Sequence, residues 1–219
     1  MTEVVIRNKK FLETLNDISD SFYATPNYDK PEYLMRHGDL DGEYYCGEEH
    51  LRETMSNPHI GYPMHHYGAP ITKMVKVDPE VWEGFQQRVK YDFAAEIGAH
   101  TSALLNYYPP GGFVEWHTNW NANAYQILFT HSVDGDGYFR YYDKKKDEIV
   151  HIQDVKGWQC RHYYFGREDE PDHHCWHSAY SGSQRITLAY KFANKSLDHE
   201  WNQGAIDARD DLIEMIESA

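Results

Sequence analysis

The stretch from Asn106 to Asn119 reads Asn-Tyr-Tyr-Pro-Pro-Gly-Gly-Phe-Val-Glu-Trp-His-Thr-Asn, and it decides the fold. A run typical of a β-strand ends in a Pro-Pro-Gly-Gly turn, and His117 follows that turn. A polar residue, Asn119, lies two positions beyond the histidine. Side chains two apart on an extended chain point to the same side. We therefore expect His117 and Asn119 to be able to approach one metal ion.

A second histidine, His177, lies about sixty residues later, and Arg185 and Thr187 follow it. Imidazole and oxygen donors suit iron(II), which must keep positions open for oxygen and a co-substrate. His173 and His174 are rivals for the second imidazole ligand. We favour His177 because a strand pattern and Arg185 follow it most directly.

The composition limits the kind of protein this can be. A chain of 219 residues fits one domain, and 41% hydrophobic residues suffice for a substantial core. The formal charge of −14 repels phosphate backbones, which argues against nucleic acid as a partner. Three widely spaced cysteines do not suggest a disulfide framework. No secretory leader or apolar run of membrane-spanning length is present, so we expect a cytoplasmic protein with no membrane partner.

Periodicity predicts helices at both ends of a β-rich centre. Apolar residues at helical spacing predict a helix within residues 4–23, and a turn-rich segment over 24–70 predicts irregular structure, either a lid or a packing layer. Asp78-Pro79 is a typical helix start, and the helix should end at Gly98. Strand patterns occupy residues 101–108, 125–130, 138–142, 148–152, 158–165 and 185–192. The chain becomes helical again after Ala193.

This order predicts an all-β core of the jelly-roll, cupin-like type with flanking N- and C-terminal α-helices. Greek-key connections in such a fold place early and late strands side by side, which would bring the two histidines together. We expect a single domain over 1–219. Its helical and irregular part is 1–100, its jelly-roll core 101–193 and its C-terminal helix 194–219.

The features over residues 101–192 resemble the 2-oxoglutarate- and iron(II)-dependent oxygenase superfamily, whose fold is a double-stranded β-helix. The resemblance implies that His117 and His177 are metal-binding, with Asn119 at the position of the family's Asp or Glu ligand. It also implies that Arg185 grips the distal carboxylate of 2-oxoglutarate, with Thr187 beside it. A guanidinium can bind a carboxylate through two parallel hydrogen bonds.

Further residues follow from the same resemblance. Asn106 and either Tyr107 or Tyr108 would contact 2-oxoglutarate, the inward tyrosine depending on strand register. The aromatic residues near the ligands would line a substrate pocket: Trp116, Trp120, Tyr125 and Trp176. The implied activity is that of an oxidoreductase, a dioxygenase that uses O2 to hydroxylate a C–H bond of a peptide or small molecule. No catalytic residue beyond the metal site is implied, and nothing in the sequence indicates an oligomeric state.

Asn119 departs from the family pattern. An amide oxygen is neutral and a weaker donor than a carboxylate. Asn119 or a water could still complete the site, chloride could fill the position as in the family's halogenases, or the domain could be a catalytically silent binding module. A neighbouring carboxylate could also substitute: Glu115, Asp134 or Asp136. A zinc site from Cys160, His162, His174 and Cys175 is a further alternative, although its spacing lacks paired knuckles.

Overall fold

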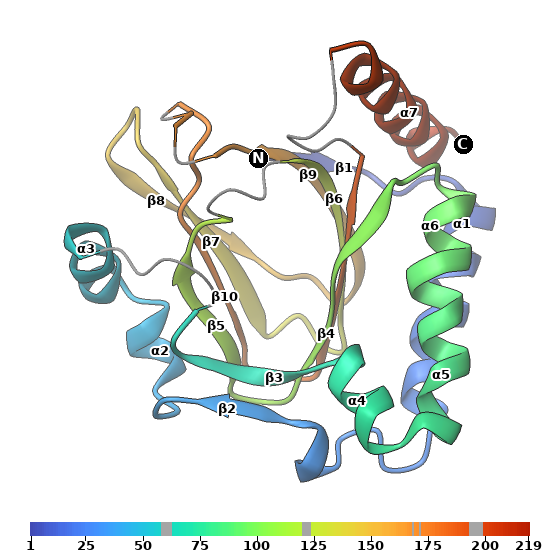
Figure 1. Ribbon diagram of the computed structural model, residues 1–219, viewed down its shortest axis with the longest axis horizontal. Coiled ribbons are helices and arrows are strands. Elements are labelled where there is room, and N and C mark those ends of the chain that lie inside the picture. Colours follow the sequence, from blue (N-terminus) through green and yellow to red (C-terminus); the bar gives the residue numbers. More distant parts are fainter. Residues whose placement is uncertain (58–62, 120–123, 168, 171, 193–198) are drawn as a thin grey trace.

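The computed structural model describes residues 1–57, 63–119, 124–167, 169–170, 172–192 and 199–219. Strands curl around a common interior, and helices cover them from outside (Figure 1). Eight successive strands form the barrel within the described residues: β4 (Thr101–Tyr108), β5 (Gly112–His117), β6 (Ala124–Ser132), β7 (Gly137–Asp143), β8 (Glu148–Gln153), β9 (Gly157–Phe165), β10 (His177–Ser181) and β11 (Arg185–Lys191).

The strand order is that of a jelly roll. One sheet has the order β1-β9-β6-β11-β4, with β1 (Thr2–Val4) at its edge, and the facing sheet has the order β5-β10-β7-β8. All named strand pairs are antiparallel, and the first and last barrel strands, β4 and β11, are neighbours. This wrapping of early against late strands confirms the predicted fold class.

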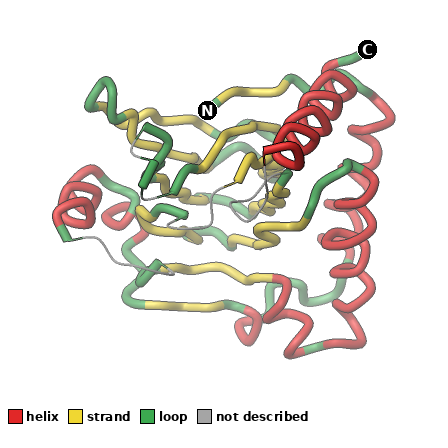
Figure 2. Tube along the Cα trace, turned by 45° about the horizontal axis from the view of Figure 1, so that its top comes forward, coloured by secondary structure: helices red, strands yellow, loops and turns green. Residues whose placement is uncertain are grey.

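Helices cover the outer face of the sheet that contains β4, and Figure 2 shows them gathered along one side of the molecule. They are α1 (Lys9–Ala24), α4 (Ile71–Val77), α5 (Pro79–Gln87), the π-helical turn Arg88–Asp92 and α6 (Phe93–Glu96). Asn8 caps α1 by accepting from the Phe11 N–H over 3.0 Å. Phe11, Trp82 and Phe93 are buried against the sheet, each contributing about 1.5–3 kcal/mol through burial.

The C-terminal helix α7 (His199–Glu217) lies over the edge formed by β1 and β9 (Figure 1). It begins after the predicted boundary at residue 193 and confirms the expected helix. None of the helices in the described ranges is long and apolar enough to cross a membrane.

The N-terminal hundred residues are more regular than expected. Residues 2–4 form a strand, and the segment 24–70 contains a 3-10 turn at Pro31–Tyr33 and four further elements: β2 (Met35–His37), α2 (Gly42–Tyr45), α3 (Glu48–Ser56) and β3 (His66–Pro70). The prediction of irregular structure there was wrong because these elements are too short to show periodicity. β3 pairs with both β4 and β5 and so links the two sheets.

A β-bulge in β5 aims its side chains in two directions. His177 pairs with His117, but Ala179 pairs with Val114, so β5 has one extra residue between these pairs. Glu115 and Trp116 consequently both contact the α2–α3 region outside the barrel, whereas the His117 ring meets the His177 ring. A bulge commonly re-aims a side chain beside a functional site.

Candidate metal and carboxylate site

Two histidines meet where β5 ends and β10 begins. The rings of His117 and His177 have centroids 4.2 Å apart. Nδ1 of His117 lies 2.8 Å from the Glu115 carbonyl oxygen, and Nδ1 of His177 lies 3.0 Å from that of Cys175. A carbonyl oxygen only accepts, so each Nδ1 must carry the hydrogen. In the neutral rings this leaves the Nε2 lone pairs as the available donors to a metal.

The surroundings favour the uncharged form of both rings. Burial lowers the pKa of His117, and burial together with the neighbouring His117 lowers the pKa of His177 well below its ordinary value. Phe139 and Phe165 have ring centroids 5.7 and 4.9 Å from that of His177 and form an apolar wall. A histidine must be neutral to bind a metal, so this environment suits a ligand pair.

Arg185 is buried inside the barrel on β11. Its Nε donates to Oδ2 of Asp154 over 2.9 Å, and its Nη1 donates to Oγ1 of Thr187 over 2.9 Å. A guanidinium has five N–H donors, so others remain available to a ligand. The Arg185 guanidinium carbon also lies 5.6 Å from the Tyr108 ring centroid. The Arg185 side chain is therefore held in one orientation, and the described residues Asp154 and Thr187 use two of its N–H donors.

Strand register shows which tyrosine shares this face. Arg185 pairs with Tyr108 and Thr187 with Asn106, so these side chains lie on the inner face of β4 and β11. Tyr107 points the other way, and its ring centroid lies 5.4 Å from that of Phe22 in the core beneath the helices. The structure brings Tyr108 to Arg185 and leaves Tyr107 outside the barrel.

Sequence reasoning missed two inward-facing groups. His66 on β3 has Nε2 3.4 Å from the Asn106 amide nitrogen, and burial lowers its pKa to about 4. Asp154, also held by Gln159 Nε2 over 2.7 Å, supplies the carboxylate beside Arg185. Both residues lie in or next to turn-rich sequence, where polar residues ordinarily face solvent, so no local pattern marks them.

Two of the four expected pocket aromatics, Trp116 and Tyr125, lie elsewhere. Trp116 is buried, and its Nε1 donates to the Gly47 carbonyl over 2.8 Å under the outer helices. Tyr125 contacts Tyr164 and Arg209, with the Arg209 guanidinium carbon 4.7 Å from its ring centroid. Neither side chain faces the histidine pair, because the bulge turns Trp116 outward and the odd-numbered residues of β6 face the helices.

Two other expected site residues lie around the end of β5 and the start of β10. Trp176 directly precedes β10, and its ring centroid is 6.1 Å from that of His174. Asn119 is half-buried two residues past the end of β5, and Trp120 lies outside the described residues.

The acidic substitutes for Asn119 are not at the histidine pair. The Glu115 side chain contacts His50 and His65 outside the barrel. Asp134 and Asp136 lie in the turn between β6 and β7, beside the end of β10, whereas His177 begins that strand. Among the described residues, the converging group of potential metal ligands with a carboxylate is His50, His65 and Glu115, and the suggested Cys160–Cys175 zinc site is not formed there.

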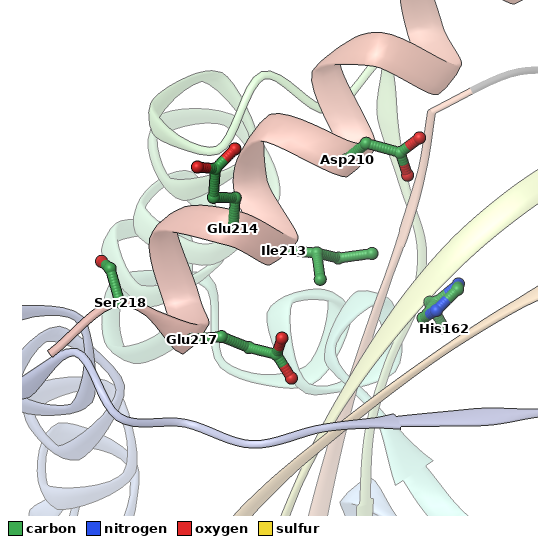
Figure 3. A pocket seen from close by; sticks show the side chains of 6 residues that line it. All are labelled: His162, Asp210, Ile213, Glu214, Glu217 and Ser218. Carbon is green, nitrogen blue, oxygen red and sulfur yellow. The ribbon is translucent and has the colours of Figure 1, made fainter.

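An open pocket lies on the outer surface, where α7 crosses β9. Figure 3 shows Ile213 of α7 directed toward His162 of β9, with acidic side chains around them. His162 occupies the outer face of β9, because the neighbouring Cys160 belongs to the core beneath the helices. This pocket is separate from the barrel interior and from Arg185.

Comparisons with known proteins find only distant structural likeness. No protein-family model matches the chain, and no curated protein matches it. A Pseudomonas putida prolyl-4-hydroxylase is 11% identical, with a TM-score of 0.34, over 81% of this chain and 98% of that one. The viral collagen prolyl hydroxylase of Paramecium Bursaria Chlorella virus-1, in its 2OG complex, is 12% identical, with a TM-score of 0.31, over 73% and 96%.

An oxalate oxidase in complex with glycolate is 10% identical, with a TM-score of 0.30. That match covers 53% of this chain and 61% of the oxidase. At such scores the likenesses add no functional argument, which rests on the strand order and the site geometry.

Proposed function

We propose that the chain is an iron(II)- and 2-oxoglutarate-dependent oxygenase that hydroxylates a C–H bond of a small-molecule or peptide substrate. The observation that supports this most is the pairing of His117 with His177 inside the barrel, each Nδ1 held by a backbone carbonyl. The two rings are thus held next to each other, with centroids 4.2 Å apart, before any metal arrives. Arg185 supports the same assignment, because it is buried and lies opposite Tyr108 on the inner face of β4 and β11.

The side chains fit the two groups that this activity needs. His117 and His177 would hold the metal, and Asn119 or a water would complete the protein side of its coordination. Arg185 would bind the distal carboxylate of 2-oxoglutarate through N–H donors not used by Asp154 and Thr187. When bound, iron with 2-oxoglutarate supplies the activation of oxygen, chemistry that no side chain provides.

The protein's own part is positioning and exclusion of water. The carbonyls of Glu115 and Cys175 orient the two imidazoles, and Asp154 and Thr187 orient the guanidinium. Phe139 and Phe165 keep the His177 side of the site apolar. Fixed donors in an apolar interior bind ions without reorganisation at the moment of reaction.

The decisive experiment is an anaerobic titration of the metal-free protein with iron(II) and then 2-oxoglutarate, monitored by visible absorption. We expect a metal-to-ligand charge-transfer band that appears only with both additions. The variant His177→Ala should lose it, whereas His151→Ala, an exposed histidine on β8, should keep it. An equal band in wild type and His177→Ala, or none in either, would contradict the assignment.

A second function, a jelly-roll binding module without oxygen chemistry, is favoured by two observations. Arg185 already has an anionic partner in Asp154. Asn119 supplies no negative charge to a metal. A protein with this function would show no stabilisation by iron(II) plus 2-oxoglutarate in a thermal melt, since a ligand of the native state raises the melting temperature. The oxygenase should be stabilised by both additions together.

A further inference from the structure

A second group of potential metal ligands lies on the outer face of β5. Oε2 of Glu115 lies 2.8 Å from Nε2 of His50 and 2.7 Å from Nδ1 of His65. The ligand atoms of the three residues all lie within 4.8 Å of one another. His50 belongs to α3, His65 immediately precedes β3, and Glu115 lies on β5. Three separate parts of the chain therefore meet at one point.

We propose that His50, His65 and Glu115 bind a divalent transition-metal ion of the zinc class, at a site separate from the histidine pair in the barrel. Two imidazoles and one carboxylate form a recognised donor set for zinc, with a fourth position open to water. Zinc binds such ligands at about 2.0–2.2 Å. In a tetrahedral site with bonds of that length the ligand atoms are about 3.3–3.4 Å apart. Oε2 of Glu115 would therefore have to move a little more than half an ångström away from each of the two imidazole nitrogens.

The surroundings permit this small movement and already fix the carboxylate. The side chains of His50 and His65 are 12% and 24% exposed, so both rings can shift toward solvent. Glu115 is held by its other oxygen, Oε1, which accepts from the backbone N–H groups of Met64 and His65. The carboxylate is therefore oriented toward the two imidazoles by its own backbone contacts.

A second observation concerns the far side of the His50 ring. Its Nδ1 is buried without a hydrogen-bond partner, and Oε2 of Glu53 lies 3.7 Å away. If Nε2 coordinates an ion, Nδ1 carries the hydrogen and can donate to Glu53, whose exposed side chain needs little movement. Such carboxylate–histidine–metal arrangements are usual around bound zinc. Without an ion, a neutral His50 that donates from Nε2 to Glu115 has an unprotonated Nδ1. The lone pair of that nitrogen then faces the Glu53 carboxylate.

The third ligand, His65, is also held in a fixed orientation. The His65 ring stacks on Tyr45 with centroids 3.8 Å apart and planes at 13°. This contact limits rotation of the imidazole and keeps Nδ1 directed at Glu115. Less rotational freedom is then lost when an ion binds.

The same ion would also affect the histidine pair inside the barrel. Glu115 supplies the outer ligand through its side chain, and its backbone carbonyl accepts from Nδ1 of His117. An ion that ties α3 and the chain before β3 to Glu115 would also restrain the orientation of His117. The existence of the outer site does not depend on the function proposed for the barrel.

The test uses the full chain with His117→Ala and His177→Ala, so that the interior pair contributes no ligand. This protein is loaded with zinc, dialysed against buffer containing a weak chelator, and analysed for zinc by mass spectrometry. We expect about one zinc per chain. Adding His50→Gln and His65→Gln should remove it, while adding His151→Gln, an exposed control, should not. Zinc-free background protein, or equal zinc after the His50 and His65 changes, would overturn the proposal.

Cobalt(II) substitution gives a readout that does not depend on stability. In the same background, a four-coordinate site should give intense visible d–d absorption, lost in Glu115→Gln. Circular dichroism of Glu115→Gln should match the background, which shows that the fold is kept. A cobalt spectrum identical to that of the free aqueous ion would count against the site, and so would intense absorption that Glu115→Gln leaves unchanged.

Discussion

Nε of Arg185 donates to Oδ2 of Asp154 over 2.9 Å, and the two side chains are only 3% and 0% exposed. Removing one member of a buried ion pair leaves the other charge without compensation, at about 3–5 kcal/mol. We therefore expect Arg185→Gln and Asp154→Asn each to lower the free energy of unfolding by about that amount. Urea denaturation followed by circular dichroism measures it.

The double variant Arg185→Gln/Asp154→Asn serves as the control for this pair. Because it removes both charges, it should be less destabilised than the sum of the single variants, with a coupling energy of about 0.5–3 kcal/mol. Strict additivity would show that the two side chains do not interact in solution.

His66, a partly buried histidine on β3, predicts a pH dependence of stability. Burial lowers the pKa of His66 to about 4, compared with about 6.5 in the unfolded chain. Between pH 4 and pH 6.5 the unfolded chain binds a proton at His66 more readily than the folded chain does. The contribution of His66 to the free energy of unfolding is therefore highest above pH 6.5. It falls as the pH drops toward 4, by about 3 kcal/mol in total.

This prediction is tested by measuring unfolding free energies from pH 7 to pH 4 for wild type and His66→Asn. Other groups also titrate in this range, so the difference between the two proteins is the relevant quantity. Below pH 6.5, the unfolding free energy of the wild type should fall relative to that of His66→Asn. Parallel profiles would mean that His66 keeps its ordinary pKa in the folded protein.

The sequence predicted the elements that are long and regular. The run from Pro79 shows helical periodicity, and Thr101–Tyr108 was predicted with the bounds that β4 has. β5 and β10 were not predicted as separate strands, because each has six residues or fewer and lies beside turn or aromatic sequence. Two elements that position the histidines therefore carried little local signal.

Side-chain direction was less predictable than strand position. The bulge between the His117 and Val114 pairs decides that Trp116 faces the outer helices, and a bulge depends on the pairing partner rather than on local sequence. Asp154 is distant in sequence from Arg185 and meets it only in the folded barrel. The metal role of His117 and His177 stays a prediction, while their convergence is a property of the fold.

The outward direction of Trp116 makes a prediction that separates packing from substrate binding. Its Nε1 donates to the Gly47 carbonyl over 2.8 Å, so Trp116→Phe should lower the unfolding free energy by about 1–3 kcal/mol by leaving that carbonyl unpaired. We expect affinity for iron(II) and 2-oxoglutarate to be unchanged, as measured by isothermal titration calorimetry under anaerobic conditions. Weaker ligand binding at unchanged stability would place Trp116 in the interior.

The neighbouring tyrosines of β4 provide a matched pair that tests the strand register. Tyr108 lies opposite Arg185 on the inner face, whereas Tyr107 packs against Phe22 beneath the helices. Tyr108→Phe should weaken 2-oxoglutarate binding to the iron-loaded protein, by about two- to tenfold if one hydrogen bond worth about 0.5–1.5 kcal/mol is lost. Tyr107→Phe should leave that affinity unchanged, because its hydroxyl lies on the other side of the sheet. Calorimetric titration of both variants measures this, and the reverse ranking would mean that β4 pairs with β11 one residue out of the register described.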